Sequence, residues 1–152
     1  MRILFVASWV VLLVISVGIA LLSVQSVFVG YSKSDENLTQ EYSAADIREQ
    51  GGDEAFNAFK GRRVTAATWA LGYALLAIAV TLVPYRRGER WAWWALLVSI
   101  GLSQILSIAR AVTIPTTSGA GTSGVLLAFT LLGLMAGAPR IFGKKPATPQ
   151  GE

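Results

Sequence analysis

Four long apolar runs alternate with shorter polar segments along the chain of 152 residues. The runs cover about residues 3–24, 64–84, 91–112 and 122–138, and none of them contains Asp or Glu. At about 1.5 Å per helical residue, runs of this length approach or cross a hydrocarbon core of about 30 Å. Because none alternates with a period of two, strands of a membrane barrel are excluded. The pattern predicts an all-α bundle of four transmembrane helices.

The first and last runs need separate comment. The first begins with Met1-Arg2, as signal peptides do, but it is too long and lacks a small-x-small cleavage site, so a retained anchor is expected. The last run is the shortest, because Thr122–Gly124 are barely apolar. Ile141 and Phe142 would help it to span.

Basic residues in the flanks predict the orientation. With the N-terminus inside, the inner segments hold seven basic residues in about 22 positions: Arg2, Arg86, Arg87, Arg90, Arg140, Lys144 and Lys145. The outer segments hold six in about 45 positions: Lys33, Arg48, Lys60, Arg62, Arg63 and Arg110. The density predicts that both termini are cytoplasmic, with the Arg62-Arg63 pair as a signal in the opposite direction. Trp91, Trp93 and Trp94 are expected to anchor the inner interface.

The outer loop, residues 31–63, holds seven of the nine acidic residues of the chain. Ser43 followed by Asp46 predicts a capped helix start, and Gly51-Gly52 predicts its end. A second helix beginning at Asp53 or Glu54 would run on into the apolar run at Val64. The acids lack the spacing of a calcium loop, so a short helical extracytoplasmic loop is expected.

Composition narrows the chemistry further. The chain is 53% hydrophobic and only 14% charged, with a net charge of +4, and it contains no Cys and no His. Disulfides, thiolate or imidazole metal sites, and mechanisms with a Cys nucleophile or a His base are therefore excluded. No nucleophile–base pair is recognisable, so we expect neither an enzyme nor a cofactor, and we attribute the positive charge to lipid headgroups rather than to nucleic acid.

Polar residues in the third run form its most informative pattern. Ser99, Ser103 and Ser107 recur every four residues and so share one helix face, with Gln104 and Arg110 adjacent. Two interpretations stay open. The small hydroxyls could allow close helix packing against Gly133-x-x-x-Gly137, with Ala66, Ala70 and Ala74 giving the second run a similar face. Alternatively, an outward-facing polar pocket forms near Arg110, with the candidate ligand-binding residues Arg110, Gln104, Ser107 and Ser103.

The domain organisation follows from these elements. Residues 1–142 form one four-helix transmembrane domain, and residues 143–152 are expected to be a disordered cytoplasmic tail. The turn Tyr85–Trp94, with its basic-Gly-basic-Trp order, and Leu38-Thr39 followed by the helical segment Ser43–Glu49 resemble small four-helix integral membrane proteins of bacteria. The resemblance implies a bacterial plasma membrane location and no assigned chemistry.

Two classes of function are therefore expected. The first is a non-catalytic accessory or structural bundle that binds membrane lipids, a partner membrane protein or a second copy of itself. The second is a transporter or lipophilic-ligand carrier that uses the pocket near Arg110.

Overall fold

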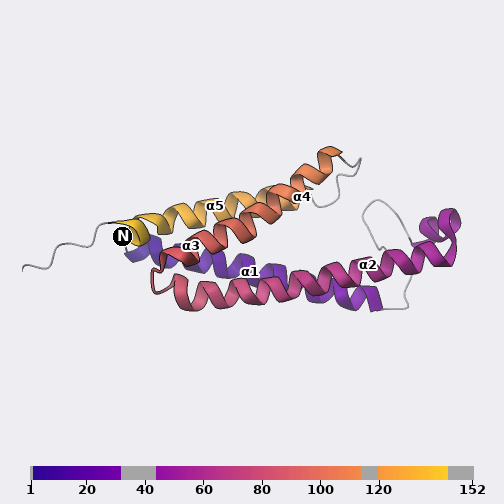
Figure 1. Ribbon diagram of the computed structural model, residues 1–152, viewed down its shortest axis with the longest axis horizontal. Helices are drawn as coiled ribbons and strands as arrows, with labels where there is room; N and C mark the ends of the chain where they lie inside the picture. Colours follow the sequence, from indigo (N-terminus) through magenta and orange to yellow (C-terminus); the bar gives the residue numbers. More distant parts are fainter. Residues whose placement is uncertain (1, 32–43, 114–119, 144–152) are drawn as a thin grey trace, which may run out of the picture.

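The computed structural model describes residues 2–31, 44–113 and 120–143, which form four antiparallel helical rods (Figure 1). No strand occurs in these residues, so the all-α, four-helix prediction is confirmed. The elements are α1 (Arg2–Tyr31), α2 (Ala44–Val80) with its π-helical extension η1 (Thr81–Tyr85), α3 (Arg90–Leu96), η2 (Leu97–Gly101), α4 (Leu102–Thr113) and α5 (Ala120–Phe142). The third rod consists of α3, the π-helical turn η2 and α4.

Each rod contains a segment long and apolar enough to cross a membrane: Ile3–Tyr31, Asp46–Tyr85, Arg90–Arg110 and Gly121–Phe142. Large apolar side chains cover the outside of the bundle, among them Leu21, Leu76 and Leu132, each more than 60% exposed. A continuous surface of this kind is unusual on a protein surrounded by water and is typical of one surrounded by lipid.

The rods extend beyond the apolar runs, and the local sequence explains the differences. α1 continues past residue 24 to Tyr31, since no charge, Pro or Gly lies between residue 24 and Gly30. The second run was expected to finish at residue 84, but Pro84 lies inside η1, which continues to Tyr85. A proline cannot donate to the carbonyl four residues earlier, and the wider π turn accommodates its ring. α5 likewise continues for three residues beyond Pro139.

The bundle is closed at the end where η1 turns into α3 and where α5 finishes. Arg86, Arg87, Arg90 and Arg140 belong to this end, and we call it the arginine end. Its core is apolar, with Phe5, Tyr85, Leu96 and Leu134 each at most 2% exposed. The Trp93 indole N–H donates to the Leu134 carbonyl at 2.9 Å, which ties α3 to α5.

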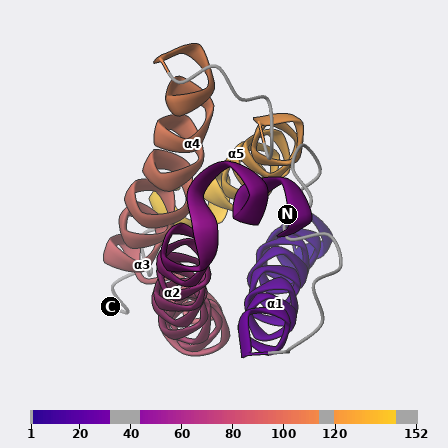
Figure 2. The ribbon, with the colours of Figure 1, turned by 90° about the vertical axis from the view of Figure 1, so that its right-hand side faces the viewer.

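At the opposite end, which we call the open end, the rods separate. α1 contacts both α2 and α5, and α5 contacts α4, but no Cα atoms of α2 and α4 lie within 8 Å of each other in the described residues. Figure 1 shows α4 rising away from α2, and Figure 2 shows the two rods apart when viewed from this end. The closed end holds the bundle together, and the open end leaves space between the rods.

The first two turns of α2 curl across the open end (Figure 2). The backbone reverses at Gly52, whose φ of 71° is readily adopted by glycine. Arg48 and Asp53 form an ion pair of 3.3 Å across this reversal, and Phe56 is buried there against Val29 and other apolar side chains. Ser43, the expected helix cap, and residues 144–152 of the expected tail lie outside the described residues.

Candidate functional site

Two of the four candidate residues on the third rod take part in hydrogen bonds of the helix framework. The Ser103 hydroxyl donates to the Ile100 carbonyl at 2.8 Å, within its own rod. The Ser107 hydroxyl accepts from Ser123 of α5 at 2.9 Å. These contacts give Ser103 and Ser107 roles in helix structure and in helix association.

Gln104 instead lines a cavity of about 390 Å³ that lies at the open end. We call it the polar cavity. All four rods contribute to its wall, and its polar lining residues are Ser23 and Ser26 from α1, Arg63 from α2 and Gln104 from α4. Their amide, hydroxyl and guanidinium groups supply several hydrogen-bond donors and one fixed positive charge.

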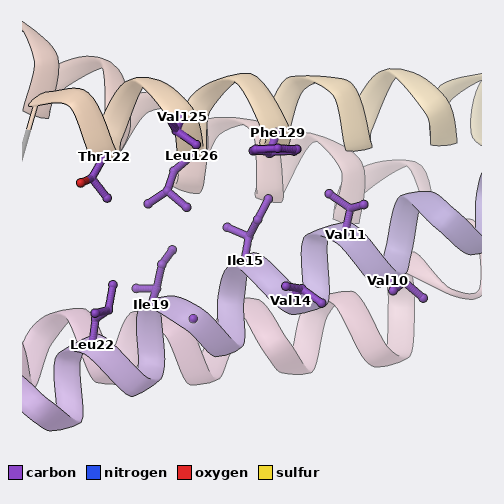
Figure 3. Close-up of a pocket in the computed structure, with 11 residues that line it drawn as sticks. Val10, Val11, Val14, Ile15, Ile19, Leu22, Thr122, Val125, Leu126 and Phe129 are labelled. Carbon is purple, nitrogen blue, oxygen red and sulfur yellow. The ribbon is translucent and has the colours of Figure 1, made fainter.

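An apolar groove of about 450 Å³ runs between α1 and α5. In Figure 3, Ile15 and Ile19 of α1 face Leu126 of α5, and Phe129 lies further along α5. Its wall is aliphatic and aromatic apart from Gly18 and Thr122. Along α1 the groove extends from Val10 to Leu22, about 18 Å at the helical rise.

The groove and the polar cavity adjoin each other. Ile19, Leu22 and Leu126 line both, so one continuous space passes from an apolar wall to a polar one. This space is the candidate functional site. It is open because α2 and α4 separate, and that separation is a property of the tertiary structure rather than of any one helix.

Arg110 lies six residues beyond Gln104, about 9 Å further along the rod, and its side chain is exposed. It is not among the residues that line the polar cavity. Of the candidate residues, the structure therefore places Gln104 in the cavity and Arg110 beyond it. The arginine that lines the cavity is Arg63, which the sequence analysis used only as evidence on orientation.

The small residues of α5 and α2 have partners that the sequence pattern does not specify. Gly133 and Gly137 face α1: a Cβ at residue 133 would meet Leu12 and Val11 of α1 at 3.4 Å. On α2, Ala74 is fully buried, whereas Ala66 and Ala70 line the polar cavity. The Gly-x-x-x-Gly face thus packs on the first rod and not on the serine face of the third.

Tyr73 forms a further polar feature between α2 and the third rod. Its hydroxyl is buried near the hydroxyls of Ser99 and Ser103, yet it makes no hydrogen bond of acceptable geometry with any described residue. Ser99 lies within η2, and π-helical turns often occur at functional positions. The feature is small and adjoins no cavity described above.

The lining of the site offers hydrogen-bond donors and apolar surface to a ligand. In the part of the chain that the structure describes, no group of His, Cys, Asp and Glu residues could hold a metal ion. The polar lining offers donors to an anionic or amide group, and the apolar lining offers an alkyl chain a surface. An amphiphile has both a polar group and an alkyl chain, so one molecule could contact both parts of the lining.

Comparisons with known proteins add no relative. Family models, curated proteins and solved structures were all searched, and none of them matches the chain.

Proposed function

We propose that this protein is a non-catalytic integral membrane protein that binds an amphiphilic lipid in the continuous space at its open end. In this proposal the four rods cross a bacterial plasma membrane with both termini on the cytoplasmic side. The observation that carries it is the junction of the apolar groove with the polar cavity at Ile19, Leu22 and Leu126.

The groove supports the apolar half of the proposal. It lies between two rods with long apolar segments, and its wall offers almost no hydrogen-bonding side chain. An acyl chain placed there would exchange contacts with bulk lipid for contacts with packed side chains. Occupancy would also restore the packing that α1 and α5 lack at this level.

The polar cavity supports the other half. A lipid headgroup bound there would meet the guanidinium of Arg63, the amide of Gln104 and the hydroxyl of Ser26. Arginine carries five N–H donors, so it can bind an acceptor of the ligand while another of its donors is engaged elsewhere. An anionic or carbonyl-rich headgroup fits this set best.

The orientation rests on the distribution of charge. The arginine end carries four basic residues around the closed end of the bundle, and basic residues are enriched on the cytoplasmic side of membrane proteins. The open end would then face outward, and the lipid site would lie in the outer leaflet.

A carrier of lipophilic molecules is the second candidate function. The same space favours it, because the site is bordered both by the outer apolar surface and by the gap between α2 and α4. Binding is common to both candidates, so the first experiment tests binding.

The test uses two glycine substitutions of equal size. Gly18→Leu places a bulky side chain in the apolar groove, and a Cβ at residue 18 meets no atom within 4 Å, so the fold is expected to tolerate it. Gly72→Leu is the matched control. Its Cβ also meets no atom within 4 Å, and residue 72 lies on the exposed side of α2, away from the groove.

The measurement is native mass spectrometry of protein purified in a mild detergent from bacterial membranes. We expect the wild type and Gly72→Leu to carry one lipid mass in defined stoichiometry, and Gly18→Leu to lose most of it. Equal lipid retention by all three proteins would refute the proposal. Spectra that show only protein masses, as multiples of this chain or with a second protein, would refute it in favour of an oligomer or a partner.

A further inference from the structure

The arginine end contains a second cavity, which is separate from the lipid site at the open end. It has a volume of about 680 Å³ and lies between the turn that joins η1 to α3 and the C-terminal end of α5. Its lining includes Arg87, Gly88, Arg90, Arg140 and Phe142. Three arginines, two from the turn and one from α5, therefore converge on one space.

The backbone of the turn brings these arginines together. Gly88 adopts a φ of 79°, and its N–H bonds to the Tyr85 carbonyl at 2.9 Å. The Glu89 N–H bonds to the Pro84 carbonyl at 3.1 Å, so the π turn η1 continues directly into a closed reversal. Arg87 and Arg90 flank this reversal, and α5 brings Arg140 to the same cavity.

Aromatic rings rather than carboxylates hold two of the three guanidinium groups. The Cζ atom of Arg140 lies 4.2 Å from the centre of the Phe5 ring, and that of Arg90 lies 5.8 Å from the centre of the Phe142 ring. A ring beneath a guanidinium leaves its N–H edges available to an acceptor in the plane.

The cavity has excess positive charge. No ion pair joins Arg87, Arg90 or Arg140 to an acidic residue among the described residues. Glu89 is the nearest acid in sequence, but it does not line the cavity, and its carboxylate accepts a hydrogen bond from the Trp91 indole at 2.6 Å. Three neighbouring cations without a counter-charge favour an anionic occupant.

From this arrangement we infer a binding site for a phosphate oxyanion, supplied by the headgroup of an anionic phospholipid. Arginine pairs with phosphate through parallel N–H donors, and basic pockets between membrane helices are suited to such headgroups. Trp91 and Trp94, each more than half exposed on α3 beside the cavity, place it at the depth where tryptophan rings meet headgroups. The phosphate groups of membrane lipids are concentrated at this depth, whereas phosphate dissolved in water is not.

The experiment compares phosphatidylglycerol with phosphatidylcholine, titrated onto delipidated protein in mild detergent and followed by native mass spectrometry. The test variant is the double substitution Arg87→Gln with Arg140→Gln. Arg86→Gln is the matched control, because Arg86 belongs to the same turn but stacks on Trp9 and does not line the cavity. Arg63→Gln at the open end measures how much of the preference belongs to the separate lipid site. Circular dichroism of each variant confirms that it remains helical.

We expect phosphatidylglycerol to bind the wild type more tightly than phosphatidylcholine. Each arginine lost should weaken this preference about five-fold, the effect of about 1 kcal/mol for one lost hydrogen bond to the headgroup. The double variant should therefore lose about 25-fold, whereas Arg86→Gln should retain most of the preference, and any loss in Arg63→Gln belongs to the lipid site at the open end.

Three outcomes would overturn the inference. An unchanged preference in the double variant would show that the cavity does not bind the headgroup. A loss of about five-fold in Arg86→Gln, equal per arginine to that of the double variant, would show that general surface charge acts instead of a site. Displacement of phosphatidylglycerol by millimolar inorganic phosphate, with phosphate mass retained on the protein, would assign the site to dissolved phosphate rather than to a lipid.

Discussion

Gly137 lies at the tightest helix contact of the arginine end, and its substitution tests the packing of the bundle directly. The Ser8 hydroxyl of α1 donates to the Gly133 carbonyl at 2.6 Å and lies 2.6 Å from the Tyr85 hydroxyl. Since serine has one proton to donate, Tyr85 is the donor in the second bond. A Cβ at residue 137 would overlap the Tyr85 hydroxyl and stand 2.6 Å from the Ser8 oxygen.

The expected cost of Gly137→Ala follows from these contacts. Tyr85 has no exposed surface and stacks on Phe5 with ring centres 5.7 Å apart, so the ring has little room to move aside. Overpacking costs about 1–3 kcal/mol. Losing an interhelical hydrogen bond within a membrane protein adds about 0.6–1.7 kcal/mol. The steric effect is the larger of the two.

Gly133→Ala is the matched control on the same face of α5. Its added Cβ would meet Leu12 and Val11 at 3.4 Å, which is ordinary van der Waals contact. Both substitutions gain about 1 kcal/mol of helix propensity, and this gain cancels when the two variants are compared. We therefore expect Gly137→Ala to have a free energy of unfolding about 2–4 kcal/mol lower than that of Gly133→Ala.

Reversible unfolding in mixed micelles, with sodium dodecyl sulfate titrated against a mild detergent, measures this difference. Fluorescence from the five tryptophans and the helical circular dichroism report the transition. A difference below about 0.5 kcal/mol, the range of an ordinary surface substitution, would show that Gly137 does not face Ser8 and Tyr85. The assignment of the Gly133 and Gly137 face of α5 to the contact with α1 would then be wrong.

Three further predictions concern other parts of the molecule. Tyr73→Phe removes a buried hydroxyl that lacks a well-formed hydrogen bond, so the free energy of unfolding should stay unchanged or rise. Tyr85→Phe removes a hydrogen-bonded hydroxyl and should lower the free energy of unfolding by about 1 kcal/mol. Equal effects of the two substitutions in the same micelle assay would contradict this prediction. Because the chain has no native cysteine, Asn57→Cys and Arg86→Cys can be labelled in intact cells with a membrane-impermeant maleimide, and only Asn57→Cys should react if the arginine end is cytoplasmic. Arg110→Ala should leave the amount of co-purified lipid unchanged, because Arg110 does not line the polar cavity, and a loss of lipid would move the site along α4 toward the pocket expected from the sequence.

The helices themselves could be predicted because their main determinant is local. A run of about 20 apolar residues has to satisfy its backbone hydrogen bonds internally, and only a helix does so within one segment. The ends were less predictable. Pro84 and Pro139 are strong local signals for termination, but the chain continues through both, with η1 widening around Pro84. Contacts such as the buried Tyr85 hydroxyl keep the last turn of this rod in place.

The choice of helix partner could not be predicted from spacing. Gly133 and Gly137 mark a face of α5 that permits close approach, but the same spacing permits approach to any of three neighbouring rods. The structure selects α1, because the Ser8 hydroxyl meets the Gly133 carbonyl there. Ser107, which the sequence grouped with Gln104, instead bonds to Ser123 of α5.

The candidate site depends on a property that no single segment encodes, namely the angle at which the rods separate. Gln104 and Arg63 lie about 40 residues apart in the sequence and line one cavity because α2 and α4 diverge from the closed arginine end. In the sequence, Arg63 stands out because the Arg62-Arg63 pair lies in a segment predicted to face outward, where basic residues are less common. Arg63 also lines the polar cavity, so an anionic headgroup bound there, as we propose, would lie beside this basic residue. At the closed end three arginines line one cavity, and no ion pair joins them to an acidic residue in the part of the chain that the structure describes, so the proposed phosphate would supply their counter-charge.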